Sequence, residues 1–199
     1  MRIYLGSCSL DEVRAFKKDA TCNASYANRV SLGFAMALVQ LEGTQGENHC
    51  VLHEINVLEG LAPPSSTKEP TQFKRPPLHP FWHKHFSTAR HLMRNMGERW
   101  GLGKSGNCEL WEMIERVAAE CGAQTDLWPK RLAHQLVLGG INDRAVARRM
   151  TGDWIIFAKY EGQNLYLGLG THDESARDTN ALYQKLRQGS EWEFPFLFS

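Results

Sequence analysis

The sequence lacks several features that would assign the protein to a common class. It has no apolar run of about 18 or more residues, the length of a membrane-spanning helix, and its N-terminus lacks the apolar core of a signal peptide. Its five cysteines are an odd number, widely scattered and without a CxxC pair. These absences argue against a membrane protein, a disulfide framework and a structural zinc site, and they predict a cytoplasmic protein with reduced thiols.

The chain as a whole also lacks a charge bias, an internal repeat and a low-complexity tract. Its 199 residues are 23% charged and 42% hydrophobic, with a formal net charge of +1. These values are typical of a folded soluble protein, and the length allows one domain with a substantial core. We therefore predict a single domain over residues 1–199, with a proline-rich loop at 60–77 inside it.

The hydrophobic pattern predicts an α+β fold. Residues 29–42 and 49–59 flank the turn-rich segment GTQGEN and favour a β-hairpin, although the first arm could instead be a helix. The segments GDWIIFAKY and NLYLGLGTH flank the turn EGQ and predict a second hairpin, whose first arm is apolar on both faces and belongs inside the sheet. We expect an antiparallel β-sheet built from an N-terminal and a C-terminal hairpin, with several helices packed mainly on one side. The final segment EFPFLF is a further predicted strand.

Charge is concentrated in one segment, residues 74–99. It holds four of the eight histidines, and its six cations oppose the single anion Glu98, which gives a local formal charge of +5. Apolar residues recur at helical spacing from Trp82 to Trp100, so we predict a helix whose other side is basic. This basic side is the best candidate for a working surface that meets phosphate. Its candidate phosphate-binding residues are Lys74, Arg75, Lys84, Arg90, Arg94 and Arg99.

A metal site is the first interpretation of the histidines. His79 and His83 stand four residues apart, as zinc ligands on one helical turn often do. However, no Asp, Glu or Cys lies nearby, the neighbouring cations would repel a divalent ion, and His83 and His85 would point about 200° apart on a helix. We therefore predict no metal and no cofactor.

Acid–base catalysis on RNA is the second interpretation. Histidine exchanges protons near neutral pH, and adjacent cations can hold a scissile phosphate. His83 and His91 would be the acid and the base, with His172 at the end of a C-terminal strand as a possible partner. Interleaved aromatic residues could offer a base a stacking platform. This interpretation predicts a nucleic-acid-interacting protein, specifically a metal-independent ribonuclease of toxin type, with RNA favoured over DNA.

Binding without chemistry is the alternative. The same basic face could bind a nucleic-acid backbone or an acidic protein surface without chemistry. A non-enzymatic inhibitor or regulator of a larger complex would dock on its partner through that face or through the apolar end WEFPFLFS. Whether the protein is an enzyme, and its oligomeric state, stay open at this point.

Three other patterns carry less weight. GLGKS at 101–105 ends like a phosphate-binding loop but lacks the first glycine and a preceding strand. INDRAVARRM at 141–150 is typical of a first helix of a helix-turn-helix, yet a strand-like segment follows it. HCVLHE at 49–54 places His49 and His53 four residues apart. On the predicted strand these two residues would lie about 13 Å apart, which is too far for both to bind one metal ion.

The C-terminal segment WIIFAKYEGQNLYLGLGTH, followed by a helix, resembles in its layout the small bacterial ribonuclease toxins of the RelE kind. Those proteins pair helices with an antiparallel sheet and place basic residues and a late histidine around an RNA groove. The resemblance covers about a quarter of the chain, involves no diagnostic motif, and the chain is about twice the usual length of that family.

Overall fold

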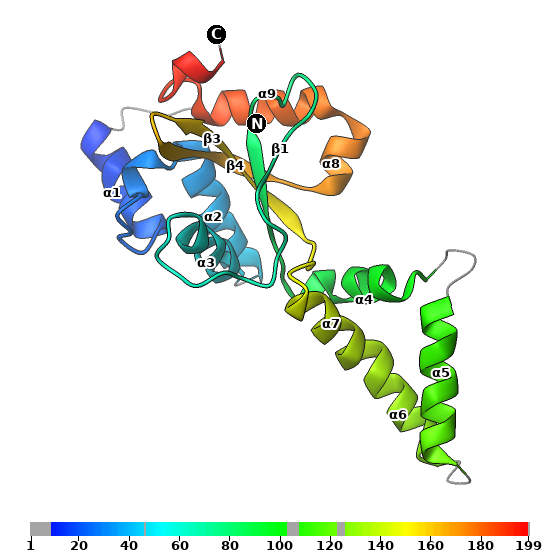
Figure 1. Ribbon diagram of the computed structural model, residues 1–199. Coiled ribbons are helices and arrows are strands. Elements are labelled where there is room, and N and C mark those ends of the chain that lie inside the picture. The colour runs from blue at the N-terminus through cyan, green and yellow to red at the C-terminus, as the bar shows by residue number, and fades with distance from the viewer. Residues whose placement is uncertain (1–8, 46, 103–107, 123–125, 199) are drawn as a thin grey trace. The chain divides into compact units, whose positions relative to one another are not determined.

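The computed structural model describes residues 9–45, 47–102, 108–122 and 126–198 (Figure 1). The chain divides into two compact units. Unit 1 comprises residues 1–63, 70–86 and 153–199, and unit 2 comprises residues 64–69 and 87–152. Whether residues 1–199 behave as a single domain stays a prediction.

Unit 1 contains a sheet that, within the described residues, has four strands. They are β1 (Thr71–Gln72), β2 (Trp82–Phe86), β3 (Asp153–Tyr160) and β4 (Gln163–Gly170), in the order β1-β2-β3-β4. Every neighbouring pair is antiparallel. The α+β class and the C-terminal hairpin are therefore confirmed, and β3 lies inside the sheet as its two apolar faces predicted.

Helices cover both faces of this sheet (Figure 1). On one face, β-strand residues such as Ile155 and Tyr166 pack against α2 (Leu32–Gln45) and α3 (Asn48–Leu58). On the other, Ile156 and Leu167 pack against α9 (Thr179–Ser190). Successive residues of a strand point to opposite faces, so a strand that is apolar at every position needs cover on both. The prediction that the helices pack mainly on one side of the sheet was wrong, because helices pack on both sides.

The predicted N-terminal hairpin at 29–42 and 49–59 was wrong, because both arms are helices. Helix α2 contacts α1 (Leu10–Ala20), α3, α9 and β4. A helix that is surrounded in this way is apolar all round, which removes the 3.6-residue period by which an amphipathic helix is recognised. The predicted final strand was also wrong: Pro195–Leu197 form a 3-10 helix, since Pro195 lacks the N–H that a strand ladder requires.

The outer edge of β4 is bound by residues from both ends of the chain. Val30 forms an isolated bridge with Tyr166, and the Ser31 amide donates to the Tyr166 carbonyl at 2.9 Å. The hydroxyls of Ser31 and Ser190 both donate to the Leu167 carbonyl, each at 3.0 Å. These bonds join the start of α2 and the end of α9 to one strand.

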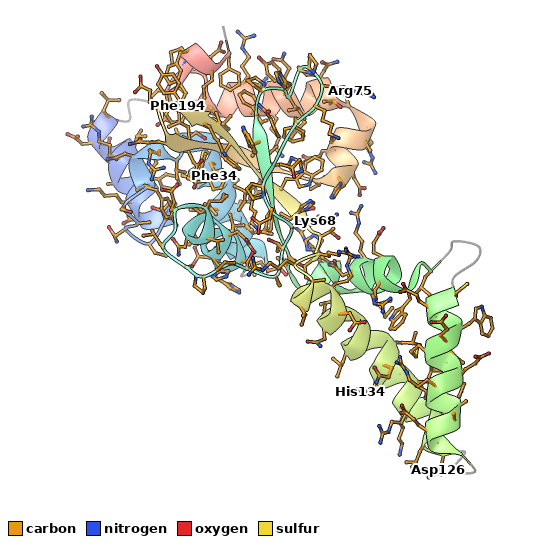
Figure 2. All side chains as sticks on the ribbon, in the orientation of Figure 1. Phe34, Lys68, Arg75, Asp126, His134 and Phe194 are labelled. Carbon is orange, nitrogen blue, oxygen red and sulfur yellow. The ribbon has the colours of Figure 1, made fainter. Side chains whose placement is uncertain are left out.

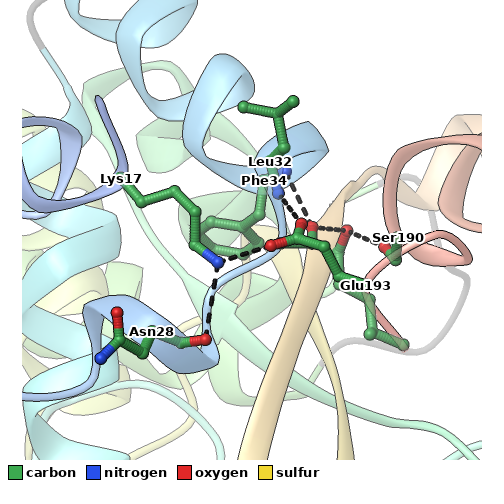
Figure 3. Close-up of polar contacts among 8 residues, drawn as sticks. Lys17, Asn28, Leu32, Phe34, Ser190 and Glu193 are labelled. Atoms are coloured by element: carbon green, nitrogen blue, oxygen red, sulfur yellow. Dashed lines mark hydrogen bonds and ion pairs between the residues drawn. The ribbon is translucent and has the colours of Figure 1, made fainter. Parts of the chain in front are cut away.

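A buried ion pair also fixes the start of α2 (Figure 3). The Glu193 carboxylate accepts a hydrogen bond from the Leu32 amide at 2.6 Å and pairs with the Lys17 ammonium at 2.6 Å. It thereby satisfies a helix N-terminal amide that has no partner within the helix. The side chains of Lys17 and Glu193 are only 6% and 11% exposed, so this contact is largely shielded from water.

Gly33→Ala is expected to destabilise unit 1 by about 1–3 kcal/mol, the usual cost of overpacking. A Cβ on Gly33 would lie 2.6 Å from the Gly189 Cα, so α2 and α9 would have to separate. Gly43 lies on the same helix with open space around it and is the matched control. Its replacement by Ala should raise stability by up to about 1 kcal/mol through helix propensity. Urea denaturation followed by circular dichroism measures both, and equal effects would contradict the predicted close approach.

Unit 2 is helical. Its elements are the 3-10 turn Ala89–His91, α4 (Leu92–Trp100), α5 (Cys108–Cys121), α6 (Trp128–His134), a π-helical turn Gln135–Gly139 and α7 (Gly140–Val146). Trp100, Met113 and Val117 form the centre of its core. The Trp100 indole donates to the Leu136 carbonyl at 2.8 Å. No helix within the described parts of either unit is long and apolar enough to cross a membrane.

Candidate functional site

The basic segment is not one helix. Residues 82–86 form β2, and the helix begins only at Leu92. The helix predicted from the apolar spacing between Trp82 and Trp100 was therefore wrong in its first half and right in its second. Along β2, Lys84 and Phe86 point to one face of the sheet and His83 and His85 to the other. The apolar spacing from Trp82 to Trp100 had concealed this period of two.

The strand brings three histidines together. His83 and His85 lie two residues apart on β2 and so share one face, with ring centroids 5.6 Å apart. His172 is the first residue of α8 (His172–Arg177), directly after the end of β4. Its ring stacks on His85 at 5.3 Å, with an interplanar angle of 24°.

Two aromatic rings complete this histidine cluster, which we define as His83, His85, His172, Trp154 and Phe73. Trp154 lies opposite His85 across β2 and β3, and its ring is 4.4 Å from His172 and 5.0 Å from His83. Phe73 lies 4.6 Å from His83. His85 and Trp154 are buried, whereas His83, His172 and Phe73 are half-buried. The cluster is therefore anchored by two buried rings, and the other three rings are partly exposed, with the His83 Nδ1 and His172 Nε2 atoms themselves buried.

The indole of Trp154 adds a polar feature. Its Nε1 is buried and has no hydrogen-bond acceptor among the described residues. A buried donor in this position is normally satisfied by a water or a ligand. The cluster therefore combines imidazole groups that can exchange protons with an indole N–H that could donate a hydrogen bond to an acceptor atom of a ligand.

Of the three predicted catalytic residues, the structure brings two together. His83 and His172 belong to the histidine cluster, while His91 belongs to unit 2. His91 is buried, and its Nδ1 accepts a hydrogen bond from the Thr88 amide at 3.0 Å. This contact is a helix-capping arrangement, which accounts for His91 without catalysis.

The six predicted phosphate-binding residues are dispersed. Lys74 and Arg75 are exposed and directly follow Phe73, in the loop between β1 and β2. Figure 2 labels Arg75. Arg90 and Arg94 are exposed on unit 2, where Arg99 binds Glu109 and Asp143. Of the exposed cations, Lys74 and Arg75 are the ones that adjoin the histidine cluster along the chain.

Lys84 has a structural environment instead. It is 2% exposed and points to the sheet face opposite His83, where it lies 3.4 Å from the Glu54 carboxylate of α3. A buried cation in an ion pair cannot reach a phosphate in solvent without leaving its partner. Lys84 is therefore left out of the proposed site.

Sequence reasoning missed His85, Trp154 and Phe73. The tripeptide HKH could have identified His85. Its two histidines are two residues apart, which is the spacing of side chains on one face of a strand. Trp154 and Phe73 carry no comparable signal. Their roles depend on the register of β2 against β3 and on the path of the loop after β1.

The structure also bears on the three minor sequence patterns and on the metal interpretation. His49 and His53 lie on helix α3, so the strand spacing predicted for HCVLHE was wrong. Residues 103–105 of GLGKS lie outside the described residues, and α7 is followed by β3 as the sequence indicated. Across the described part of the chain, no group of three or more His, Cys, Asp or Glu side chains could hold a metal ion.

A second polar cluster is structural. Burial raises the pKa of the Glu59 carboxyl, but hydrogen bonds from Arg29, Tyr166 and Asn164 outweigh burial and hold that pKa below its usual value. Burial and the Glu59 charge raise the pKa of Tyr26 to about 12. Burial and its hydrogen bond to Glu59 also raise the pKa of Tyr166. Both phenols stay neutral at physiological pH and cannot serve as bases there.

Unit 2 contains a hollow of about 630 Å³ with both signs of charge. Arg99 at its wall binds Glu109 and Asp143, and the Arg144 side chain donates to Asn95 and to the Arg149 carbonyl. Because Arg99 and Arg144 already bind other groups of unit 2, the hollow is a weaker candidate for an anion-binding site than the histidine cluster.

Comparison with known proteins adds no further candidate: no family model, curated protein or solved structure matches the chain.

Proposed function

We propose that the protein is a metal-independent ribonuclease in which His83 and His172 exchange protons with the substrate. The observation that carries this proposal is the meeting of three histidines and two aromatic rings on one end of a sheet face. His83 and His172 are half-buried, so ring atoms other than the buried His83 Nδ1 and His172 Nε2 can contact a substrate. Buried His85 contacts the rings of both and holds them in position.

The reaction needs only two imidazoles. One neutral imidazole takes the proton of a ribose 2′-hydroxyl, and the O2′ oxygen attacks the adjacent phosphorus. The P–O5′ bond breaks, and the other, protonated imidazole gives its proton to the departing O5′ oxygen. The products are a 2′,3′-cyclic phosphate and a 5′-hydroxyl end. Atoms and charge balance without water or metal.

Other groups supply orientation and charge stabilisation. A buried donor such as the Trp154 indole N–H is worth more in a site shielded from water than on the surface. Lys74 and Arg75 provide exposed positive charge in the loop that follows Phe73, where it would attract the RNA backbone.

Non-enzymatic binding of a protein partner is the second candidate. It is favoured by large apolar side chains exposed on unit 2, among them Val146 (78%), Met93 (71%) and Trp111 (64%). Exposed large apolar side chains are candidates for contact with a protein partner, although single exposed residues are common. In the C-terminal segment Phe194 and Phe198 are buried, whereas Trp192 (47%) and Phe196 (45%) are exposed, so part of that segment is also apolar surface.

The purified protein is expected to cut a labelled single-stranded RNA in the presence of excess chelator, because both proton carriers belong to the chain. The fragments should end in 2′,3′-cyclic phosphate, which phosphatase sensitivity before and after acid treatment identifies. An RNA with one 2′-deoxy nucleotide should resist cleavage at that position only. Absence of cleavage under all conditions, or cleavage that requires added metal, would remove the proposal and leave the binding candidate.

A further inference from the structure

We infer that Phe73, with Lys74 and Arg75, forms the element that recognises an unpaired nucleotide, so that the substrate is single-stranded rather than duplex RNA. The inference rests on the proposed function, because it names the substrate class of the same site. It concerns binding, however, and can be measured without cleavage.

Phe73 is positioned to stack a base beside a proton carrier. Its ring lies 4.6 Å from His83 and 5.6 Å from Trp154. Its side chain packs against the core around Phe81 and is half-buried, directly after the edge strand β1. A base stacked on Phe73 would therefore place its ribose and phosphate close to the His83 imidazole. Bases stack on aromatic side chains in most single-strand binding sites, since every base has a π-face.

The loop that carries these residues is held in place by hydrogen bonds. The Phe73 amide donates to the Phe81 carbonyl at 2.9 Å, and the His79 amide donates to the Arg75 carbonyl at 3.0 Å. The Gln72 side chain donates to the Pro80 carbonyl at 2.9 Å. The loop is thus tied at three points while the Lys74 and Arg75 side chains are exposed. A preformed loop loses little conformational freedom when it binds a ligand.

The choice of single strand follows from the geometry of stacking. In a duplex each base is covered on both faces by its neighbours, so a protein ring can reach a face only after the base is unstacked and unpaired. An unpaired base offers that face directly. Two consecutive cations beside the ring would then contact the phosphates on either side of the stacked nucleotide.

The test measures binding by fluorescence anisotropy with the His172→Ala variant, so that the RNA stays intact. The probes are a fluorescein-labelled RNA oligonucleotide and the same strand annealed to its complement. The single strand should bind more tightly. Phe73→Leu should weaken single-strand binding by about 5- to 150-fold, the range of one base–aromatic stack, while Phe73→Tyr should keep it.

The cations have their own readout and control. Replacing both Lys74 and Arg75 by Gln should lower the slope of log affinity against log salt by about 0.7 for each phosphate that the variant no longer binds. Lys18→Gln, at an exposed lysine of α1, should leave the slope unchanged. Because Lys74 and Arg75 are exposed, this pair of substitutions keeps the test valid even where Phe73→Leu impairs folding.

Two sets of results distinguish the binding element from the catalytic function. Equal affinity for single strand and duplex, or no effect of either set of substitutions, overturns the inference whether or not the protein cleaves RNA. Phe73-dependent binding of single strands by a protein that never cleaves overturns the ribonuclease proposal and supports the binding element.

Discussion

Replacement of His172 by Ala is expected to slow RNA cleavage by about 10²- to 10⁴-fold, the usual contribution of one acid–base group. His83→Ala should have a similar effect. Since the two imidazoles act in the same transition state, the double substitution should cost little more than either single one. Single-turnover cleavage with saturating RNA measures this loss apart from any change in binding.

The pH profile distinguishes a proton carrier from a residue that only supports the fold. The wild-type rate should follow a bell-shaped curve, and each substitution should remove one limb of it. His134→Ala, at an exposed histidine of α6, is the matched control and should change neither rate nor profile. A bell that keeps both limbs in the His83 and His172 variants would mean that other groups carry the protons.

Glu54→Ala is expected to destabilise unit 1 by about 3–5 kcal/mol, because it removes the carboxylate that lies 3.4 Å from the buried Lys84 ammonium. The Glu54 and Lys84 side chains are 5% and 2% exposed, so water cannot replace the missing carboxylate without a local opening. Urea denaturation of wild type and variant, with the transition slopes compared, gives the difference.

A double substitution tests whether the charge or the packing is responsible. Replacing Lys84 by Met and Glu54 by Leu keeps the buried volume and removes both charges, so stability should return to near the wild-type value. If the double variant is as unstable as Glu54→Ala, the loss comes from packing or from other interactions of these side chains. RNA cleavage in the double variant should be unchanged, since the pair lies on the face opposite the histidine cluster.

The C-terminal hairpin could be predicted from the sequence because both strands are apolar, close in the chain and joined by a turn signal. The N-terminal helices were harder to predict, because the residues of α2 from Leu32 to Val39 are all apolar and contain no period to count. What makes it a helix is its surroundings: α1, α3, α9 and β4 all contact it. Some of these partners are distant in the sequence, so the residues of α2 alone do not reveal them.

The histidines were partly predictable. Composition identified the segment, and the position of His172 after a strand suggested a partner for it. The error was one of period: from Trp82 to Trp100 the apolar spacing fits a helix, although β2 pairs with β1 and β3 instead. On a helix the His83 and His85 side chains would point in different directions, whereas on a strand they lie on the same face. Tertiary pairing thus decided the geometry that local spacing alone left ambiguous.

The bonds along the outer edge of β4 have a consequence for how the protein behaves at high concentration. An edge strand with open carbonyls is a template for another chain and a starting point for aggregation. Here the Tyr166 and Leu167 carbonyls are taken by Ser31 and Ser190, and α2 and α9 meet beside them. The opposite edge, β1, is only two residues long. Neither edge of the described sheet offers a long open ladder, so growth of the sheet by addition of a further molecule is disfavoured at both ends.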